Sequence, residues 1–270
     1  MNIKNLETWE DFEKEIALLI ADRKEREKET PSSVSHFLYR GQGDSTWDLK
    51  TTLDRYCNDD FNVKEYYRAI FRSKPEIETF SNKSWDIKTP PQYEEWLEKN
   101  DFYVEFPAYE YMVYLRHHGF PSPLLDWSRS PYVAAFFAFS NVSIKADSVS
   151  VYVYQAHSKG GKVWSSSSPH IHSRGPLVTS HKRHFLQKAE YTICVVNANR
   201  EWHYSCHEHT FAKNMLNQDI LYKFNIPTSE RLKVLRKLDD FNINHFALLG
   251  TEDALMETMA IRELYLRDLR

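Results

Sequence analysis

Glycine is scarce in this sequence, and the common glycine-rich phosphate-binding motifs are missing. The 270 residues include 7 glycines, where average usage of about 7% would give roughly 19. Neither G-x-G-x-x-G nor G-x-x-x-x-G-K-[ST] occurs, so we expect neither a Rossmann dinucleotide site nor a P-loop. The sequence also lacks the apolar run of about 18 residues that a membrane-spanning helix needs.

Cysteine and positive charge are low as well. Three cysteines (Cys57, Cys194 and Cys206) are too few, and odd in number, for a disulfide framework, which favours a reducing compartment. The N-terminal residues MNIKNLETWEDFEKE contain no apolar core of a signal peptide. A formal net charge of −3 excludes nucleic-acid binding through bulk charge, although a local basic patch stays open. We expect a cytoplasmic protein without a membrane partner.

Aromatic residues, in contrast, are abundant at 14% of the chain. Such rings can supply core volume, or they can line a pocket for a flat ligand, and composition does not separate these uses. The hydrophobic pattern predicts one α+β domain. Thr8 is expected to cap a helix over 9–29, and 132–139 can be a helix or a strand, with Pro131 favouring the helix. Further helices are expected within 52–74 and at 93–100, 109–117, 229–238 and 252–269, and strands at 36–41, 149–154, 190–196 and 220–226.

Arg40 follows a short apolar segment and precedes Gly41. Burying a guanidinium without a partner costs free energy, and its planar fork fits phosphate or carboxylate. The glycine lets a ligand approach the backbone. The pattern predicts an anion-binding arginine. The alternative is a structural ion pair at the end of a strand.

A second polar segment, 116–128, gathers two histidines, Asp126, Trp127 and Ser128 around a proline-rich turn. Loops on a rigid scaffold often carry binding sites. Aspartate and serine are also preferred helix N-caps, so the alternative is an aspartate that caps the next helix beside a core tryptophan. A third segment places a basic cluster at 181–184 before a strand that starts at Glu190. Its alternative is a solvated basic loop and an edge-strand carboxylate.

Two of these segments resemble the FRG domain family. FLYRGQ at 37–42, followed by Trp47-Asp48-Leu49, is similar to the aromatic-Arg-Gly signature of that family. HHGFPSPLLDWSRSPYVAAFFAF at 117–139 is similar to its most distinctive motif, with Ser122-Pro123 where Thr-Arg is usual. The resemblance extends over roughly residues 20–250.

The order of parts in turn resembles the ADP-ribosyltransferase fold. That resemblance implies an α+β domain at 31–250 with a split, mixed β-sheet core. A helical lead-in at 1–30 precedes this domain, and a C-terminal helix at 251–270 packs on it. The resemblance also implies that NAD is the substrate, bound without a glycine-rich loop, and that no metal takes part.

The same resemblance implies a role for each matching residue. Glu190 would stabilise the oxocarbenium-like transition state, Arg40 would hold the diphosphate, and Gln187 would orient the acceptor. Lys182 and Arg183 would contact the acceptor. The stacking ring at the nicotinamide would come from Tyr39, Tyr111 or Trp127. The full set implied to bind NAD is Tyr39, Arg40, Gly41, Tyr111, His117, Asp126, Trp127 and Ser128.

Three functions follow as hypotheses. The first is an NAD-dependent ADP-ribosyltransferase of the toxin or anti-phage kind. Its acceptor would be nucleic acid, with RNA favoured, or protein, and an inhibitory antitoxin would be its partner. The second is a non-catalytic nucleotide- or nucleic-acid-binding module. A glutamate at 190 in a cleft facing Arg40 favours catalysis, whereas one on an exposed edge favours binding.

The third hypothesis is a metal-dependent nuclease. Four residues of zinc-ligand type lie close together in the sequence, but the paired spacing of a zinc finger is absent, so we expect no metal site. These residues are His203, Cys206, His207 and His209.

Overall fold

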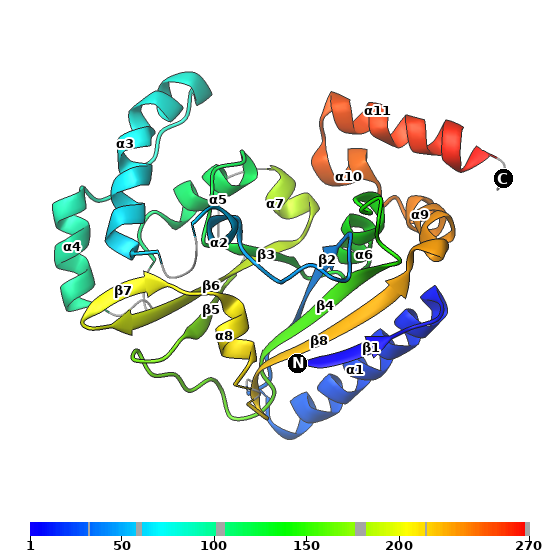
Figure 1. Ribbon diagram of the computed structural model, residues 1–270, viewed down its shortest axis with the longest axis horizontal. Coiled ribbons are helices and arrows are strands. Elements are labelled where there is room, and N and C mark those ends of the chain that lie inside the picture. Colours follow the sequence, from blue (N-terminus) through cyan, green and yellow to red (C-terminus); the bar gives the residue numbers. More distant parts are fainter. Residues whose placement is uncertain (32, 58–60, 101–105, 176–181, 214, 268–270) are drawn as a thin grey trace.

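An eight-stranded mixed sheet forms the centre of the molecule (Figure 1). The computed structural model describes residues 1–31, 33–57, 61–100, 106–175, 182–213 and 215–267. The strand order is β1-β8-β4-β2-β3-β6-β5, with β7 paired to β6. This confirms the α+β class. The strands are β1 (Asn2–Asn5), β2 (Phe37–Gln42), β3 (Leu125–Ser128), β4 (Ser148–His157), β5 (His170–Arg174), β6 (Ala189–Ala198), β7 (Glu201–Tyr204) and β8 (Gln218–Pro227).

The middle of the sheet is joined by very few backbone pairs. β2 pairs with β4 along its whole length, and β3 pairs with β6 along its whole length. Between β2 and β3, in contrast, the register holds one pair, Tyr39 with Ser128. We call this place the seam. Beyond it the two strands separate, so the backbone around Gly41 and Asp126 is not joined by a ladder.

One side of the sheet is covered by α1 (Trp9–Glu29), α6 (Pro131–Ser140) and α9 (Arg231–Asp240). The predicted capping box is present, since the Thr8 side chain accepts from the Asp11 backbone N–H and the Asp11 carboxylate accepts from that of Thr8. Pro131 occupies the first turn of α6, which resolves the 132–139 alternative in favour of the helix. The helix expected at 229–238 begins later, at Arg231, because Ser229 lies inside a 3₁₀ turn, Thr228–Glu230, that precedes α9.

Of the other helices, α2 (Thr52–Tyr56), α5 (Tyr109–His117) and α7 (Lys182–Leu186) lie near β3 at the middle of the view in Figure 1. At the end of the sheet near β7 lie α3 (Val63–Ser81) and α4 (Pro90–Lys99), which pack with α5 around an aromatic core. The expected helical stretch 52–74 is two helices, because α2 ends before α3 begins. The remaining helices are α8 (His207–Phe211), α10 (His245–Leu249) and α11 (Glu252–Ala260), which is followed by a π-helical turn, Ile261–Tyr265.

Thr251 caps α11, with its side chain accepting from the Ala254 N–H. Among the described helices, none combines the length and apolar character that crossing a membrane requires. Within the described part of the chain, Cys57, Cys194 and Cys206 form no disulfide.

Candidate functional site

A cleft of about 250 Å³ opens where β2 and β3 separate. Most of the residues that the sequence singled out lie along it, although they come from distant segments of the chain. They are Tyr39, Arg40, Gly41, His117, Asp126, Trp127, Ser128 and Gln187. The sequence did not single out the rest of the lining, which is Gln42, Gly43, Trp47, Arg55, Ala134, Phe137, Asn141 and Ala189.

Arg40 and Asp126 are joined across the open part of the seam. The Arg40 Nη1 donates to the Asp126 carboxylate and to the Asp126 carbonyl, the latter at 2.8 Å. A second guanidinium, Arg116, donates through Nη2 to the same carboxylate oxygen at 2.6 Å and through Nη1 to Thr52 Oγ1 at 3.1 Å. The alternative proposed for Arg40, an ion pair at a strand end, is therefore present, while Asp126 caps no helix. Ser130 caps α6 instead.

This triad leaves the cleft with an excess of positive charge. Burial on its own raises the pKa of the Asp126 carboxyl, but the charges of Arg116 and Arg40 outweigh it and hold that pKa far below its ordinary range. Burial lowers the pKa of Arg40, and the neighbouring charges of Arg116 and Arg55 add to this effect. The Asp126 side chain is still 42% exposed. Two guanidiniums, Arg40 and Arg116, therefore share one carboxylate that is partly exposed, and the guanidinium of Arg55 also lines the cleft.

Gly41 and Gly43 are needed for packing rather than for ligand access. A Cβ on Gly41 would lie 1.9 Å from the Ala134 carbonyl oxygen of α6. On Gly43 it would lie 1.8 Å from the Asn141 carbonyl oxygen. Real carbon atoms do not approach this closely, so the two glycines let α6 and the residue after it lie directly on β2 and its loop.

The floor of the cleft is held by hydrogen bonds between segments. Ser128 Oγ donates to the Gln187 carbonyl at 2.7 Å, and the Gln187 side chain donates to the Leu248 carbonyl of α10 at 3.3 Å. His117 Nε2 lies 2.8 Å from the hydroxyl of Tyr191. The site therefore draws on β3, β6, α5 and the C-terminal helices.

Residues 35–147 match the family model of the FRG domain. The chain carries an FRG domain. The match is shorter than the span of resemblance, and it includes the seam with Arg40 and Asp126. No match was found among curated proteins or among solved structures.

Two of the rings expected to stack on the nicotinamide, Tyr39 and Trp127, line the cleft but are buried. Tyr39 and Trp127 are 4% and 3% exposed, and burial raises the pKa of Tyr39 to about 12. The Trp127 indole donates to Thr192 Oγ1 at 2.8 Å and packs on Tyr154 in the core. Trp47, in the loop after β2, is 43% exposed. Trp47 belongs to the family signature, and this motif could have identified it as a site residue from the sequence.

Glu190 lies outside the FRG domain cleft. Side chains alternate along a strand, and Ala189 lines the cleft, so Glu190 projects from the opposite face. The His36 Nε2–H donates to its carboxylate at 3.1 Å, and Arg129 forms an ion pair with it. Burial raises the pKa of Glu190, but the hydrogen bonds and charges of His36 and Arg129 outweigh this and lower it. The carboxylate is buried, as catalysis was expected to require, but it faces these two residues and not Arg40.

Tyr111, Lys182 and Arg183 also do not line the cleft. Tyr111 is fully buried in α5, and its hydroxyl donates to the Ile70 carbonyl at 3.3 Å. Lys182 is exposed on α7, the short helix that precedes Gln187. Of the basic cluster at 181–184, His181 lies outside the described residues, and His184 is buried with its ring stacked on Tyr191.

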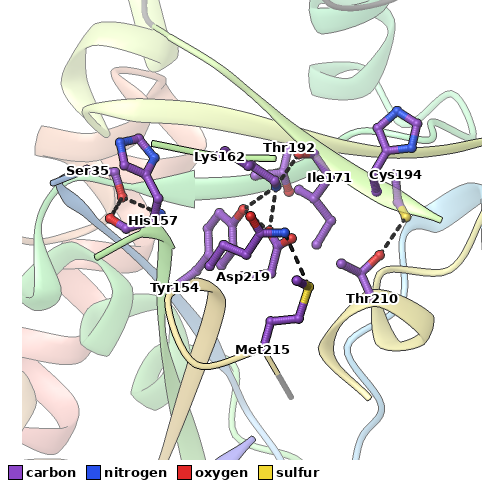
Figure 2. Close-up of polar contacts among 12 residues, drawn as sticks. Ser35, Tyr154, His157, Lys162, Ile171, Thr192, Cys194, Thr210, Met215 and Asp219 are labelled. Carbon is purple, nitrogen blue, oxygen red and sulfur yellow. Dashed lines mark hydrogen bonds and ion pairs between the residues drawn. The ribbon is translucent and has the colours of Figure 1, made fainter. Parts of the chain in front are cut away.

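On the other face of the sheet lies a buried polar cluster, shown in Figure 2. Lys162 donates to the Ile171 carbonyl and pairs with Asp219, whose carboxylate also accepts from the Tyr154 hydroxyl at 2.7 Å. Since Lys162 belongs to the loop 158–169, this cluster fastens that loop to β5 and β8. Within the described part of the chain, no group of three or more His, Cys, Asp or Glu residues is placed to hold a metal ion.

Proposed function

We propose that the chain is an NAD-dependent ADP-ribosyltransferase and that NAD occupies the cleft at the seam. One observation carries the proposal. The residues that the resemblance assigned to NAD come from separate segments, and all but Tyr111 line this one cleft. The separation of β2 and β3 supports it further, because a split sheet is what the resemblance implied.

The reaction breaks the bond between the nicotinamide nitrogen and C1′ of the ribose. It then joins C1′ to an acceptor nucleophile, which loses a proton, while nicotinamide leaves. The transition state carries positive charge on the sugar, so a fixed carboxylate beside it lowers the barrier. Among the described residues that line the cleft, the carboxylate is Asp126. We therefore assign this role to Asp126 and treat Glu190, which follows Ala189 on β6, as a positioning residue.

Arg40 is placed to bind the diphosphate. Its Nη1 is engaged by Asp126, whereas its Nη2 makes no hydrogen bond within the described part of the chain and remains to donate to an anionic oxygen. The surplus of guanidiniums over carboxylates in the cleft favours a doubly charged group. Ser128 and Gln187 supply polar groups at the opposite wall.

The test is to incubate the purified protein with adenylate-labelled NAD and separate pools of RNA, DNA and protein. We expect label in one pool, with transfer reduced at least 100-fold by Asp126→Asn, as for loss of a transition-state contact. Arg40→Lys keeps the charge but loses the planar fork, so it should weaken NAD binding. If Glu190→Gln abolishes transfer while Asp126→Asn leaves it intact, our assignment of the two carboxylates is reversed.

A non-catalytic nucleotide-binding module is the second candidate. The observation that favours it is that two guanidiniums already engage the Asp126 carboxylate, while Glu190 faces away from the cleft. Under this reading NAD or a nucleotide binds, but labelled NAD stays intact with every pool. Binding without turnover in the wild-type protein, after removal of any copurified inhibitor, would establish this candidate and exclude the transferase.

For the acceptor we propose single-stranded nucleic acid, with RNA first. The exposed Lys182 lies on α7, beside Arg183, and α7 leads into Gln187 at the cleft. An affinity for single-stranded RNA that falls with rising salt supports this, and transfer of label to protein alone excludes it. We also propose, from the resemblance, a toxin or anti-phage role with an inhibitory partner protein. Growth arrest on induction of the wild-type chain, but not of Arg40→Lys, tests that role.

A further inference from the structure

A second cavity adjoins the cleft, and the two share Trp47 and Arg55. It has a volume of about 350 Å³ and is lined by Thr46, Trp47, Asp48, Lys50 and Arg55. The cleft itself, at about 250 Å³, is smaller than the roughly 300–1,000 Å³ of most small-molecule pockets. A dinucleotide has two nucleotide halves, so a cleft of this size accommodates one of them and the other must extend over the shared wall.

Trp47 offers a ring to such a ligand. It is exposed by 43%, in contrast to the buried Tyr39 and Trp127. The loop that carries it is fixed on both sides of Trp47, so the ring stands on a preorganised platform. The bonds that fix the loop are Ser45 N–H to the Ser148 carbonyl at 2.9 Å, Gln42 Nε2 to the Asp48 carbonyl at 3.1 Å, Leu49 N–H to Glu208 Oε1 at 3.1 Å and the Tyr152 hydroxyl to the Trp47 carbonyl at 3.4 Å.

Arg55 offers a cation at the junction of the two cavities. Within the described residues its guanidinium takes part in no hydrogen bond or ion pair, whereas Arg40 and Arg116 both engage Asp126. The positive charge of Arg55 lowers the pKa of Arg40, because the two guanidiniums repel each other across the cleft that both line. An anion bound beside both removes this repulsion. Its helix α2 is held in place by Leu53 N–H, which donates to the Ser122 carbonyl at 3.1 Å.

We propose that Trp47 and Arg55 form the adenylate subsite of the dinucleotide. The adenine stacks on the Trp47 ring, Arg55 pairs with the adjacent phosphate, and the nicotinamide half occupies the cleft beside Asp126. An aromatic ring can hold a base by stacking, and an arginine can bind the phosphate through its planar fork, so neither contact needs a glycine-rich loop. This inference rests on the proposed function, because it divides the same ligand between two cavities.

The test measures binding of AMP, nicotinamide mononucleotide and NAD to the full chain by calorimetry. We expect Trp47→Ala to weaken AMP and NAD about tenfold, the effect of losing one stacked base. Binding of nicotinamide mononucleotide should stay unchanged. Arg55→Gln should weaken AMP and NAD and reduce their salt dependence. Trp47→Phe keeps a stacking ring and should restore most of the affinity, which guards against a misfolded alanine variant.

Two matched controls come from neighbouring or similar side chains. Tyr56 adjoins Arg55 on α2 and is 78% exposed, but it lines neither cavity. Arg68 is an exposed arginine on α3, paired with Glu94 at 2.6 Å. Tyr56→Ala and Arg68→Gln should leave all three affinities at their wild-type values.

The outcomes separate this inference from the proposed function. If Trp47→Ala and Arg55→Gln bind NAD as the wild type does, the subsite is wrong while the NAD site stands. If the wild type binds none of the three ligands, the adenylate subsite and the proposed transferase function are both wrong. AMP binding that depends on Trp47, without any binding of nicotinamide mononucleotide or NAD, supports a nucleotide subsite and removes the transferase. If Trp47→Ala weakens only the binding of a single-stranded oligonucleotide, Trp47 belongs to the acceptor site and the inference is overturned.

Discussion

At the scale of single residues, the site depends on how charges are paired. Asp126 is shared by Arg40 and Arg116, so the three side chains form one unit at the open part of the seam. Removing the carboxylate leaves two guanidiniums facing each other in a partly buried place. Such an uncompensated charge is more costly than the pair itself is stabilising.

We therefore expect Asp126→Asn to lower the free energy of unfolding by about 2–3 kcal/mol, at or below the lower end for a buried pair because the carboxylate is partly exposed. The pKa of Asp126 is held below its ordinary range, so its contribution is present above the unfolded pKa and lost only in strong acid. The loss caused by the substitution should thus be constant from pH 7 to 5. Urea unfolding at several pH values measures it. Asp48→Asn, at an exposed carboxylate 3.6 Å from Lys50, should change stability by less than about 0.5 kcal/mol.

His207 is the residue whose titration should be visible in stability. It is fully buried, and its Nε2 lies 2.9 Å from Thr192 Oγ1. That hydroxyl also accepts from the Trp127 indole at 2.8 Å, so it can serve His207 either as a donor or as a second acceptor. Burial, with the nearby charge of Arg40, lowers the pKa of His207 to about 3.

A histidine with a depressed folded pKa stabilises the protein above its unfolded pKa of about 6.5 and loses that contribution as pH falls towards 3. His207→Gln should therefore make the free energy of unfolding less dependent on pH between 6 and 4, by up to about 1.4 kcal/mol per pH unit. Guanidinium unfolding across this range measures the slope. His209→Gln, on the same helix but exposed, is the control. An unchanged slope in His207→Gln contradicts the assignment.

At the scale of elements, the place of α6 on β2 decides the shape of the cleft. The helix lies so close that Gly41 and Gly43 are enclosed by its backbone and by the residue after it. Ala134 and Phe137 of α6 then line the cleft beside β2. From the sequence, Gly41 was predicted to let a ligand approach the backbone. The structure shows that helix packing already uses the space.

Gly41→Ala should accordingly cost more than the about 1–3 kcal/mol typical of overpacking, because the new methyl meets backbone that cannot move alone. The cost should appear as a lower midpoint in thermal and urea unfolding. Gly175→Ala is the matched control, since no atom of the described residues lies within 4 Å of the added Cβ there, and its midpoint should stay near the wild-type value. Equal midpoints for the two variants would show that α6 does not press on β2.

The elements that the sequence predicted well are those with a clear apolar period. Helix α1, strand β6 and strand β8 belong here. Strand β5 holds His170, His172 and Arg174 among its five residues, and β1 is exposed along its length, so neither shows an alternating apolar pattern. Their pairing is set by the neighbouring strands β6 and β8, which local sequence does not reveal.

The site residues that the sequence predicted correctly are those that belong to short sequence motifs. Arg40, His117 and Asp126 stand in such motifs, and the structure brings them together. Glu190 was chosen from its place in a strand, and a register difference of one residue sends its side chain to the opposite face. Arg55 had no signal in the sequence, because its role depends on where α2 folds against the loop.

At the scale of the whole molecule, the proposed ligand lies between two halves of the sheet. NAD at 100 times its dissociation constant should stabilise the folded state by about 2.7 kcal/mol. For a chain of this size that corresponds to a rise of about 5–10 °C in the thermal midpoint. Differential scanning calorimetry with and without NAD measures it. Arg40→Lys should show a smaller rise at the same NAD concentration, and an identical rise would place the ligand elsewhere.

The single registered pair at the seam also has a mechanical consequence. Two well-laddered halves, β1-β8-β4-β2 and β3-β6-β5, are joined at their centre by Tyr39 and Ser128. The halves are also joined by a side chain, since Arg40 Nη1 on β2 donates to the Asp126 carbonyl on β3 at 2.8 Å. The side chains that would read the ligand stand on both halves, so a small twist alters the width of the cleft. A ligand that contacts both halves would therefore hold them at one relative twist, and NAD is the ligand that we propose.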